Sequence, residues 1–174
     1  QQCARRTQTE MRILEMNAER FLDPNALTDV IDRRTRIFAC THISNVTGSI
    51  NDVAALVRAA RAINPDIIIV VDAAQSAANI PIRVRDLDCD FLIASGHKMF
   101  GPKGIGFLYG KRARLDDLPP FLFGGEMVEY VSDRESSFKA PPQKFEAGTP
   151  SIADAIALGA ALEYITSHSR EAIL

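Results

Sequence analysis

A continuous run of β-branched residues constrains this chain more than any other feature. Residues 67 to 71 read Ile-Ile-Ile-Val-Val, and the run ends at Asp72. Such a run without polar alternation is typical of a strand that is buried on both faces, as in a parallel sheet covered by helices. Residues 53–63 place apolar side chains on one helical face, so a helix precedes this strand. The sequence therefore predicts an α/β fold.

Further apolar stretches extend this alternation along the chain. We expect strands over residues 12–16, 37–43, 91–94 and 105–109, and helices over residues 26–31 and 152–167. Strands that alternate with helices favour a mixed sheet that is mainly parallel. Residues 119–142, which contain several Pro and Gly residues, are expected to form loops. No repeat or linker interrupts the pattern, so we interpret residues 1–174 as a single domain.

Composition narrows the classes of function. The net charge of -2 argues against a nucleic-acid or membrane-surface role, because both usually need a basic face. The longest apolar stretch is too short to span a bilayer. The three cysteines are odd in number and scattered, which favours reduced thiols and a cytoplasmic protein over a disulfide framework.

Polar residues follow three of the expected strands at the point where each strand ends. Asn45, Asp72 and Lys98 each come after a different strand. In open α/β sheets, ligands collect beyond the carboxyl ends of the strands. If the strands are neighbours, these three side chains converge on one crevice.

Several of these polar residues also have a purely structural interpretation. Asp72 taken alone could cap a short helix, and Asn45 with Gly48 could form an ordinary turn. We interpret His42 and His168 as structural, since neither has metal-ligating neighbours in the sequence. The combination of groups is more specific than any single member.

The combination fits pyridoxal 5'-phosphate (PLP). This cofactor needs a lysine for an imine, a carboxylate facing the pyridine nitrogen, and hydroxyl and cationic donors for the phosphate. Lys98 and Asp72 supply the first two groups, and Ser95 and His97 flank the lysine where the phosphate is expected. The separation of Asp72 and Lys98 leaves room for a connection and one further strand, so both can lie at neighbouring strand ends.

Six longer motifs surround these residues. In chain order they are Thr41-His42-Ile43-Ser44-Asn45-Val46-Thr47-Gly48, Val70-Val71-Asp72-Ala73-Ala74-Gln75-Ser76, Leu87-Asp88-Cys89-Asp90-Phe91, Ser95-Gly96-His97-Lys98-Met99-Phe100-Gly101-Pro102-Lys103-Gly104-Ile105-Gly106, Phe123-Gly124-Gly125-Glu126-Met127 and Lys144-Phe145-Glu146-Ala147-Gly148-Thr149-Pro150. Together they resemble the class V aminotransferase family, and within it the cysteine desulfurases of the SUF type. The likeness covers essentially the whole chain.

The resemblance implies the large domain of the PLP-dependent transferases of fold type I, with a mixed, mainly parallel sheet sandwiched by helices. Lys98 would then carry PLP as an imine, and Asp72 would pair with the pyridine nitrogen. Gln75 would hydrogen-bond the phenolic oxygen of the cofactor. Ser95 and His97 would hold its phosphate.

The resemblance also implies roles for residues outside this group. Asn45 would lie near the phenolic oxygen and the substrate carboxylate. Gly148 and Thr149 would reach the phosphate of a neighbouring subunit, which implies a homodimer with shared active sites. The residues alone leave a second interpretation equally open, in which Thr149 or Ser151 only starts the helix at Ile152.

The implied activity is that of a cysteine desulfurase, which converts L-cysteine to L-alanine and passes the sulfur to an acceptor protein for iron–sulfur cluster assembly. Family members place further catalytic residues before the region matched by Gln1 and after the region matched by Leu174, among them the persulfide-forming cysteine. Cys3, Cys40 and Cys89 do not match that position, and the apolar surroundings of Cys40 and Cys89 favour inert thiols. We therefore expect residues 1–174 to be a large-domain fragment that lacks the N-terminal and C-terminal parts of the parent enzyme and is inactive alone.

Two alternative functions remain open. A selenocysteine lyase, or another class V lyase or epimerase, would share these motifs. A truncated interaction module would keep the fold and have no catalytic activity. The motifs do not distinguish these alternatives from a desulfurase.

Overall fold

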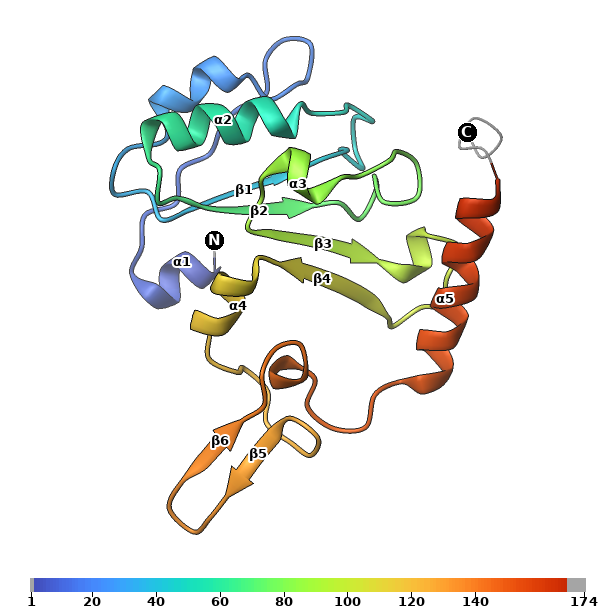
Figure 1. The fold of residues 1–174 in the computed structure, drawn as a ribbon. Coiled ribbons are helices and arrows are strands. Elements are labelled where there is room, and N and C mark those ends of the chain that lie inside the picture. Colours follow the sequence, from blue (N-terminus) through green and yellow to red (C-terminus); the bar gives the residue numbers. More distant parts are fainter. Residues whose placement is uncertain (1, 169–174) are drawn as a thin grey trace.

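A computed structural model describes residues 2–168 (Figure 1). Helices and strands alternate along this part of the chain, which confirms the expected α/β fold. None of its helices is both long enough and apolar enough to cross a membrane. The elements are, in order, α1 (Gln2–Thr7), η1 (Pro24–Asp29), β1 (Ile37–Thr41), α2 (Val53–Ile63), β2 (Ile68–Asp72), α3 (Val84–Leu87), β3 (Phe91–Ser95), η2 (Gly96–Lys98), β4 (Gly106–Gly110), α4 (Arg112–Asp117), β5 (Val128–Val131), β6 (Ser136–Phe138), η3 (Gln143–Phe145) and α5 (Ile152–Ser167), where η marks a 3-10 helix.

The central sheet has the strand order β1-β2-β3-β4. Strands β1, β2 and β3 are parallel to one another, and β4 is antiparallel to β3. The β-branched strand β2 thus lies between two parallel neighbours, as its sequence predicts. Thr41 lies beside Asp72 in the register, and Asp72 lies beside Ile93. The expectation of a mixed, mainly parallel sheet is confirmed.

One face of the sheet shares its core with α2, whose bounds match the expected helix. Asp52 caps this helix, because its side chain accepts a hydrogen bond of 2.9 Å from the backbone N–H of Ala55. The spacing of the apolar residues in α2 turns one stripe of the helix toward the strands. The buried residues shared by the helix and the strands are Phe38, Cys40, Val53, Leu56, Val57, Ala60, Ile69, Val71 and Leu92.

The opposite face of the sheet is open in the described part of the chain. Ile37, Ile93 and Leu108 lie on this face, with 59%, 42% and 55% of their surface exposed. Ile68 and Val70 of β2 are only half-buried on the same face. An apolar surface is therefore left across all four strands.

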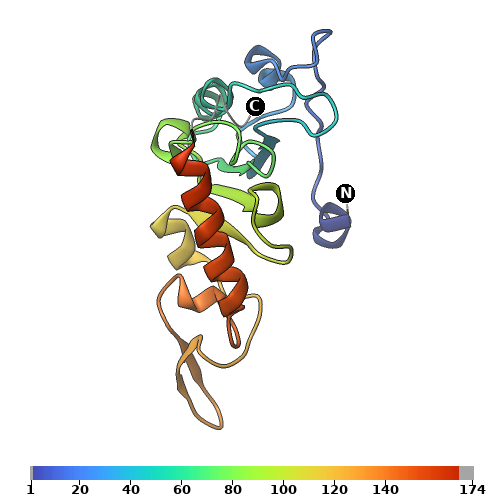
Figure 2. The same cartoon turned by 90° about the vertical axis from the view of Figure 1, so that its right-hand side faces the viewer.

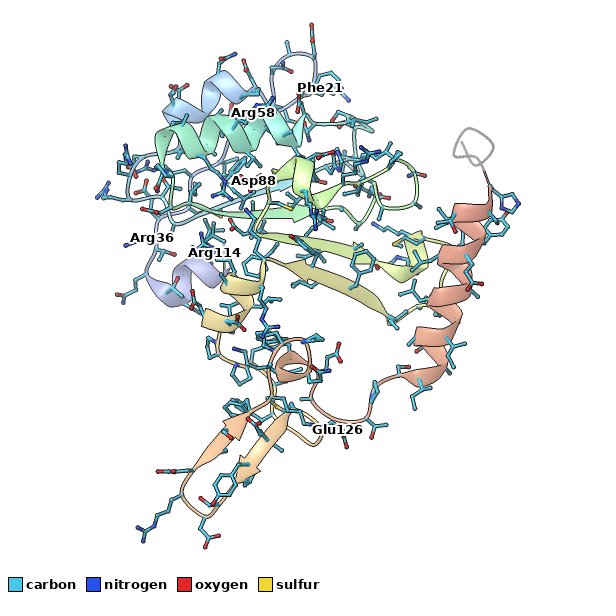
Figure 3. All side chains as sticks on the ribbon, viewed as in Figure 1. Phe21, Arg36, Arg58, Asp88, Arg114 and Glu126 are labelled. Carbon is cyan, nitrogen blue, oxygen red and sulfur yellow. The ribbon has the colours of Figure 1, made fainter. Side chains whose placement is uncertain are left out.

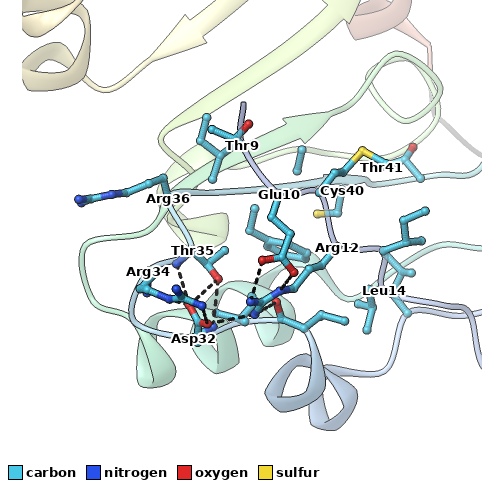
Figure 4. Close-up of a pocket in the computed structure, with 18 residues that line it drawn as sticks. Thr9, Glu10, Arg12, Leu14, Asp32, Arg34, Thr35, Arg36, Cys40 and Thr41 are labelled. Atoms are coloured by element: carbon cyan, nitrogen blue, oxygen red, sulfur yellow. Dashed lines mark hydrogen bonds and ion pairs between the residues drawn. The ribbon is translucent and has the colours of Figure 1, made fainter. Parts of the chain in front are cut away.

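The expected strand at residues 12–16 is wrong. Only Met16 forms a β-bridge, and that bridge is isolated. Residues 9–14 instead line a cleft of about 750 Å³ together with β1, so they lie near the sheet without joining it (Figure 4). Arg12 is held in this segment by an ion pair with Glu10, at 2.7 Å between Nε and Oε1. This segment has the apolar pattern of a strand, but it lines the cleft and pairs with no strand of the described sheet.

Other expectations differ from the structure over short segments. The expected helix at residues 26–31 is the 3-10 helix η1, which Asp23 caps by accepting a hydrogen bond from the backbone of Asn25. The loop-rich stretch contains the hairpin of β5 and β6, which projects away from the central sheet (Figure 1). Its strands are short and mostly exposed, so no buried periodic pattern announces them.

Helix α5 has the bounds that the sequence predicts, and it lies beside the carboxyl end of β3 (Figures 1 and 2). A second, smaller core joins Ile165 of this helix to Ala94 of β3 and to Met99. Ala78, which follows β2, completes this core. Helix α5 therefore packs against the turn that follows β3.

An ionic cluster occupies the opposite edge of the sheet, where β2 and β3 begin. The side chain of Asp90 is 2% exposed, and it accepts a hydrogen bond of 2.8 Å from the backbone N–H of Ile69. Its carboxylate also pairs with Arg61 at 3.1 Å and with Arg114 at 3.2 Å. Figure 3 labels Arg114 and the neighbouring Asp88 in this region. The cluster joins α2, β2 and α4.

The ionised carboxylate of Asp90 stabilises the folded chain through its hydrogen bond and ion pairs. Burial by itself raises the pKa of this carboxyl, but the hydrogen bond from Ile69 and the guanidinium groups of Arg114 and Arg61 lower it below its ordinary value. A carboxyl with a lowered pKa in the folded state contributes stability above its unfolded pKa. That contribution is lost as the pH falls through the folded pKa.

We expect Asp90→Asn to lower the free energy of unfolding at pH 7 by about 1.5–3 kcal/mol, the usual contribution of hydrogen bonds to a charged group. The difference in unfolding free energy between this variant and the unsubstituted chain should shrink as the pH falls below about 4, where the carboxyl of the unfolded chain is protonated. Urea unfolding at both pH values measures it. Asp116→Asn, which breaks an exposed pair with Arg112, is the control and should change stability by less than about 0.5 kcal/mol. Equal losses in the two variants would contradict the role of Asp90.

Candidate active site

The carboxyl ends of β1, β2 and β3 meet at one edge of the sheet, as their parallel pairing requires (Figure 1). The backbone N–H of His42 donates a hydrogen bond of 2.9 Å to the carbonyl oxygen of Asp72, which ties β1 to β2 at this edge. Lys98 follows β3 directly, through the single turn η2. The prediction that Asn45, Asp72 and Lys98 follow neighbouring strands is confirmed.

Lys98 is the last residue of η2 and is exposed. Its Nζ forms no hydrogen bond or ion pair with residues 2–168. The turn that carries it is tightly packed, because the backbone N–H of Gly96 donates to the carbonyl oxygen of Ile105 at 2.8 Å. A Cβ at Gly96 would lie 2.8 Å from that same oxygen, so a side chain cannot be added there. A rigid turn thus presents an unpaired amine.

Asp72 ends β2 with an exposed carboxylate. Its Oδ1 accepts a hydrogen bond of 2.9 Å from the backbone N–H of Ala74, so the side chain does stabilise the following turn. Its Oδ2 makes no hydrogen bond within the described part of the chain. The structural interpretation of Asp72 therefore accounts for one oxygen and leaves the other available to a ligand.

Two side-chain pairs flank the lysine and the carboxylate. Ser95 Oγ and His97 Nδ1 lie 2.9 Å apart, which places a hydroxyl and an imidazole side by side next to Lys98. Gln75 Nε2 donates a hydrogen bond to Asn45 Oδ1, and this bond joins the loop after β2 to the loop after β1. Sequence reasoning named all four residues but did not foresee either pair.

Gly148 and Thr149 are tied to a different part of the chain. Gly148 has a φ of 86°, in the left-handed region that favours glycine. Its backbone N–H donates a hydrogen bond of 2.9 Å to the carbonyl oxygen of Gly125. Thr149 is exposed, and its side chain makes no hydrogen bond with residues 2–168. The structure therefore does not join these two residues to the group around Lys98.

Asn51 is a structural support that sequence reasoning missed. It is buried, and its side chain donates to the carbonyl oxygen of Thr41 at 3.0 Å and accepts from the backbone N–H of Leu22 at 3.0 Å. Its backbone N–H donates to the carbonyl oxygen of His42. These bonds fix the end of β1. A lone Asn before a helix gives no sequence signal for such a role.

His42 is buried on the core side of the sheet, in agreement with its structural interpretation. Burial lowers the pKa of its imidazole, which favours the neutral ring. Its Nδ1 has no hydrogen-bond partner among the described residues. No group of three His, Cys, Asp or Glu side chains in this part of the chain could hold a metal ion.

The cleft of about 750 Å³ between residues 9–14 and β1 extends along this strand to its last residue, Thr41 (Figure 4). Its lining includes none of the residues predicted for the site. It contains Cys40, whose side chain also contributes to the main core. We therefore assign the candidate active site to the strand ends and not to this cleft.

One edge of the sheet thus carries an unpaired amine, a carboxylate with an unpaired oxygen, a hydroxyl beside an imidazole, and two amides. Ligands of open α/β sheets collect at such an edge, so this edge is the candidate site of an α/β protein. The model of the family described as "Aminotransferase class-V" matches residues 1–174. The chain therefore belongs to the class V aminotransferase family.

Curated proteins and solved structures that are similar to this chain include cysteine desulfurases. A probable cysteine desulfurase of Streptomyces coelicolor is 42% identical over 171 residues, which are 98% of this chain and 40% of that protein. The crystal structure of the cysteine desulfurase CsdA from Escherichia coli matches 97% of this chain and 42% of its own, at 40% identity and a TM-score of 0.92. The cystine C–S lyase C-DES, solved with glycine covalently linked to its PLP cofactor, matches 85% of this chain and 40% of its own, at 25% identity and a TM-score of 0.75. The chain spans about 40% of the length of the curated relatives it matches.

The two thiols of the main core, those of Cys40 and Cys89, are buried in the folded chain. Burial raises the pKa of Cys40 to about 12 and also raises the pKa of Cys89. The thiolate is the reactive form, so little of it exists at neutral pH. This agrees with the expectation that neither cysteine is a nucleophile.

We expect Cys40 and Cys89 to resist iodoacetamide at pH 8 in the folded chain, because both are buried and protonated. Peptide mass mapping after timed labelling measures this. In urea both residues should react at the rate of a free cysteine, which serves as the control. Rapid labelling of either residue without denaturant would contradict the burial of these thiols.

Proposed function

We propose that this chain is the PLP-binding part of a cysteine desulfurase, with Lys98 as the residue that holds the cofactor. The observation that carries the proposal is the placement of an unpaired amine and a carboxylate with an unpaired oxygen at adjacent strand ends. The donor set fits PLP, since the hydroxyl and imidazole of Ser95 and His97 suit its phosphate. The names of the relatives support the choice of reaction.

The residues at the strand ends divide the work. PLP, when bound, supplies a ring that accepts electrons from the substrate carbon. Asp72 would hold a proton at the pyridine nitrogen through its unpaired oxygen, while its other oxygen keeps the side chain in place. Lys98 would hold the cofactor through its amine, and the same amine would move a proton at the substrate carbon. Gln75 and Asn45 would orient the phenolic oxygen of the cofactor and the substrate carboxylate.

The substrate in this proposal is L-cysteine, whose sulfur passes to an acceptor protein for iron–sulfur cluster assembly. The protein would work in the cytoplasm as a homodimer, in which Gly148 and Thr149 reach the phosphate of the other subunit. The exposure of Thr149 and the left-handed backbone of Gly148 support a role outside the chain's own site. Residues 1–174 would form one domain that lacks the N-terminal and C-terminal parts of the parent.

A second candidate is an interaction module that keeps this fold and has no catalytic activity. A selenocysteine lyase or another class V lyase or epimerase would share the same strand ends. The candidates differ in whether Lys98 reacts with PLP and in which substrate is consumed.

The first test of the proposal concerns Lys98. Incubation of the chain with PLP followed by borohydride should place a stable adduct on Lys98, because Ser95 and His97, which flank it, would hold the phosphate of the cofactor beside its unpaired amine. Peptide mass mapping locates the adduct. Lys103, which is exposed and lies in the same glycine-rich loop, is the internal control and should carry several-fold less label. Preferential labelling of Lys103 or Lys111 would reject the assignment.

A second test concerns Asp72. Asp72→Asn keeps an oxygen for the Ala74 backbone but removes the charge, so PLP affinity should fall about 10-fold or more, as expected for a charge-assisted hydrogen bond. Thermal unfolding should be nearly unchanged. Asp52→Asn, at the cap of α2, is the matched control and should leave PLP affinity unaltered. Parental affinity in Asp72→Asn would mean that Asp72 only stabilises its turn.

A third test concerns activity. We expect the 174-residue chain to release no alanine and sulfide from L-cysteine with PLP and a reductant present. None of its three cysteines matches the catalytic position of the family, and Cys40 and Cys89 are buried. An assay of alanine formation over several hours measures this. Sustained turnover would show that the chain is catalytically complete and would overturn the proposed division of the parent.

A further inference from the structure

The chain reverses direction immediately after Lys98. Phe100 has a φ of 58°, in the left-handed region that bulky residues rarely adopt. Its neighbours Met99 and Gly101 both donate backbone hydrogen bonds to the carbonyl oxygen of Gly96, at 2.8 and 3.0 Å. The segment thus closes on itself around the lysine, and the left-handed residue makes this closure possible.

Two buried residues of helix α5 pack against this turn. Leu158 lies directly against the backbone, since a Cβ at Gly101 would come within 3.0 Å of its Cδ1. Ile165 packs with Met99 in the smaller core. These contacts anchor the residues on either side of Phe100 to the same helix.

A third contact with α5 involves two exposed aromatic rings. The ring of Phe100 meets the ring of Tyr164 edge-on, with centroids 5.6 Å apart and an interplanar angle of 66°. Phe100 is 60% exposed and Tyr164 is 49% exposed, so burial in a core does not account for their placement. The ring of His168 lies against that of Tyr164, with centroids 4.3 Å apart and an interplanar angle of 36°. The edge-on contact holds a backbone conformation that is otherwise unfavourable for phenylalanine.

We propose that Phe100 is a positioning residue for Lys98, supported by Tyr164 of α5. The ring contact keeps the left-handed turn closed, and the closed turn holds the lysine amine at the carboxyl edge of β3. Phe100 acts through the backbone and not by touching a substrate. The inference deepens the proposed function and rests on the proposed role of Lys98.

Amide hydrogen exchange of Met99 and Gly101 in the chain without PLP tests the closure of the turn. Phe100→Ala and Tyr164→Ala should each speed this exchange about 2- to 10-fold, the range expected from losing one aromatic pair. The double variant should show little more than either single variant, because both remove the same contact. Tyr164→Phe keeps the ring and should restore the parental rate. Tyr130→Ala, an equally exposed aromatic on the hairpin, is the matched control.

The rate at which PLP labels Lys98, trapped by borohydride, tests the consequence for the amine. Phe100→Ala and Tyr164→Ala should slow this labelling several-fold, while Tyr164→Phe and Tyr130→Ala should not. Unchanged amide exchange in both alanine variants, or additive effects in the double variant, would overturn the ring contact. Faster exchange with unchanged labelling would overturn the positioning of Lys98. If PLP does not label Lys98 in the unsubstituted chain, the proposed function is rejected. The amide exchange rates would still decide whether the ring contact closes the turn.

Discussion

Parallel pairing of β2 with both neighbours is the constraint on which the rest of the structure depends. It forces the three strands to end at one edge, and every residue of the candidate active site lies within a few residues of such an end. The pairing is stabilised from both directions. The core with α2 holds the strands along their length, and the ionic cluster of Asp90 fixes the edge at which β2 and β3 begin. At the other edge, the amine of Lys98 and one carboxylate oxygen of Asp72 have no partner among the described residues.

The sequence predicts α2 from the apolar residues on one of its faces and β2 from its continuous β-branched run. Helix α5 also has the expected bounds, although Leu158, Ala161 and Ile165 are its only buried residues in the described chain. Residues 12–16 carry a similar apolar pattern but meet no partner strand in the described chain, and a pattern alone cannot reveal whether a partner exists. The hairpin of β5 and β6 is mostly exposed and therefore leaves no such pattern.

The sequence names the residues of the candidate site, but it does not predict their contacts. Asn45 and Gln75 are named by motif, yet their hydrogen bond joins loops that are far apart in the sequence. The same holds for Asn51 and for the contact of Phe100 with Tyr164, because each depends on how two elements meet in space. Gly148 and Thr149 are described without any link to Lys98, so their proposed role across a subunit boundary stays a prediction.

Strand β1 ends the described sheet on one side, and the apolar face with Ile37, Ile93 and Leu108 runs across it. An edge strand with free backbone groups is a template for pairing with another chain, and a neighbouring apolar surface adds a driving force for association. The 174-residue chain is therefore expected to self-associate through the edge of β1 and the exposed apolar face beside it. Charged substitutions at Ile37 and Ile93 would make the chain more soluble at high concentration while leaving the strand ends intact.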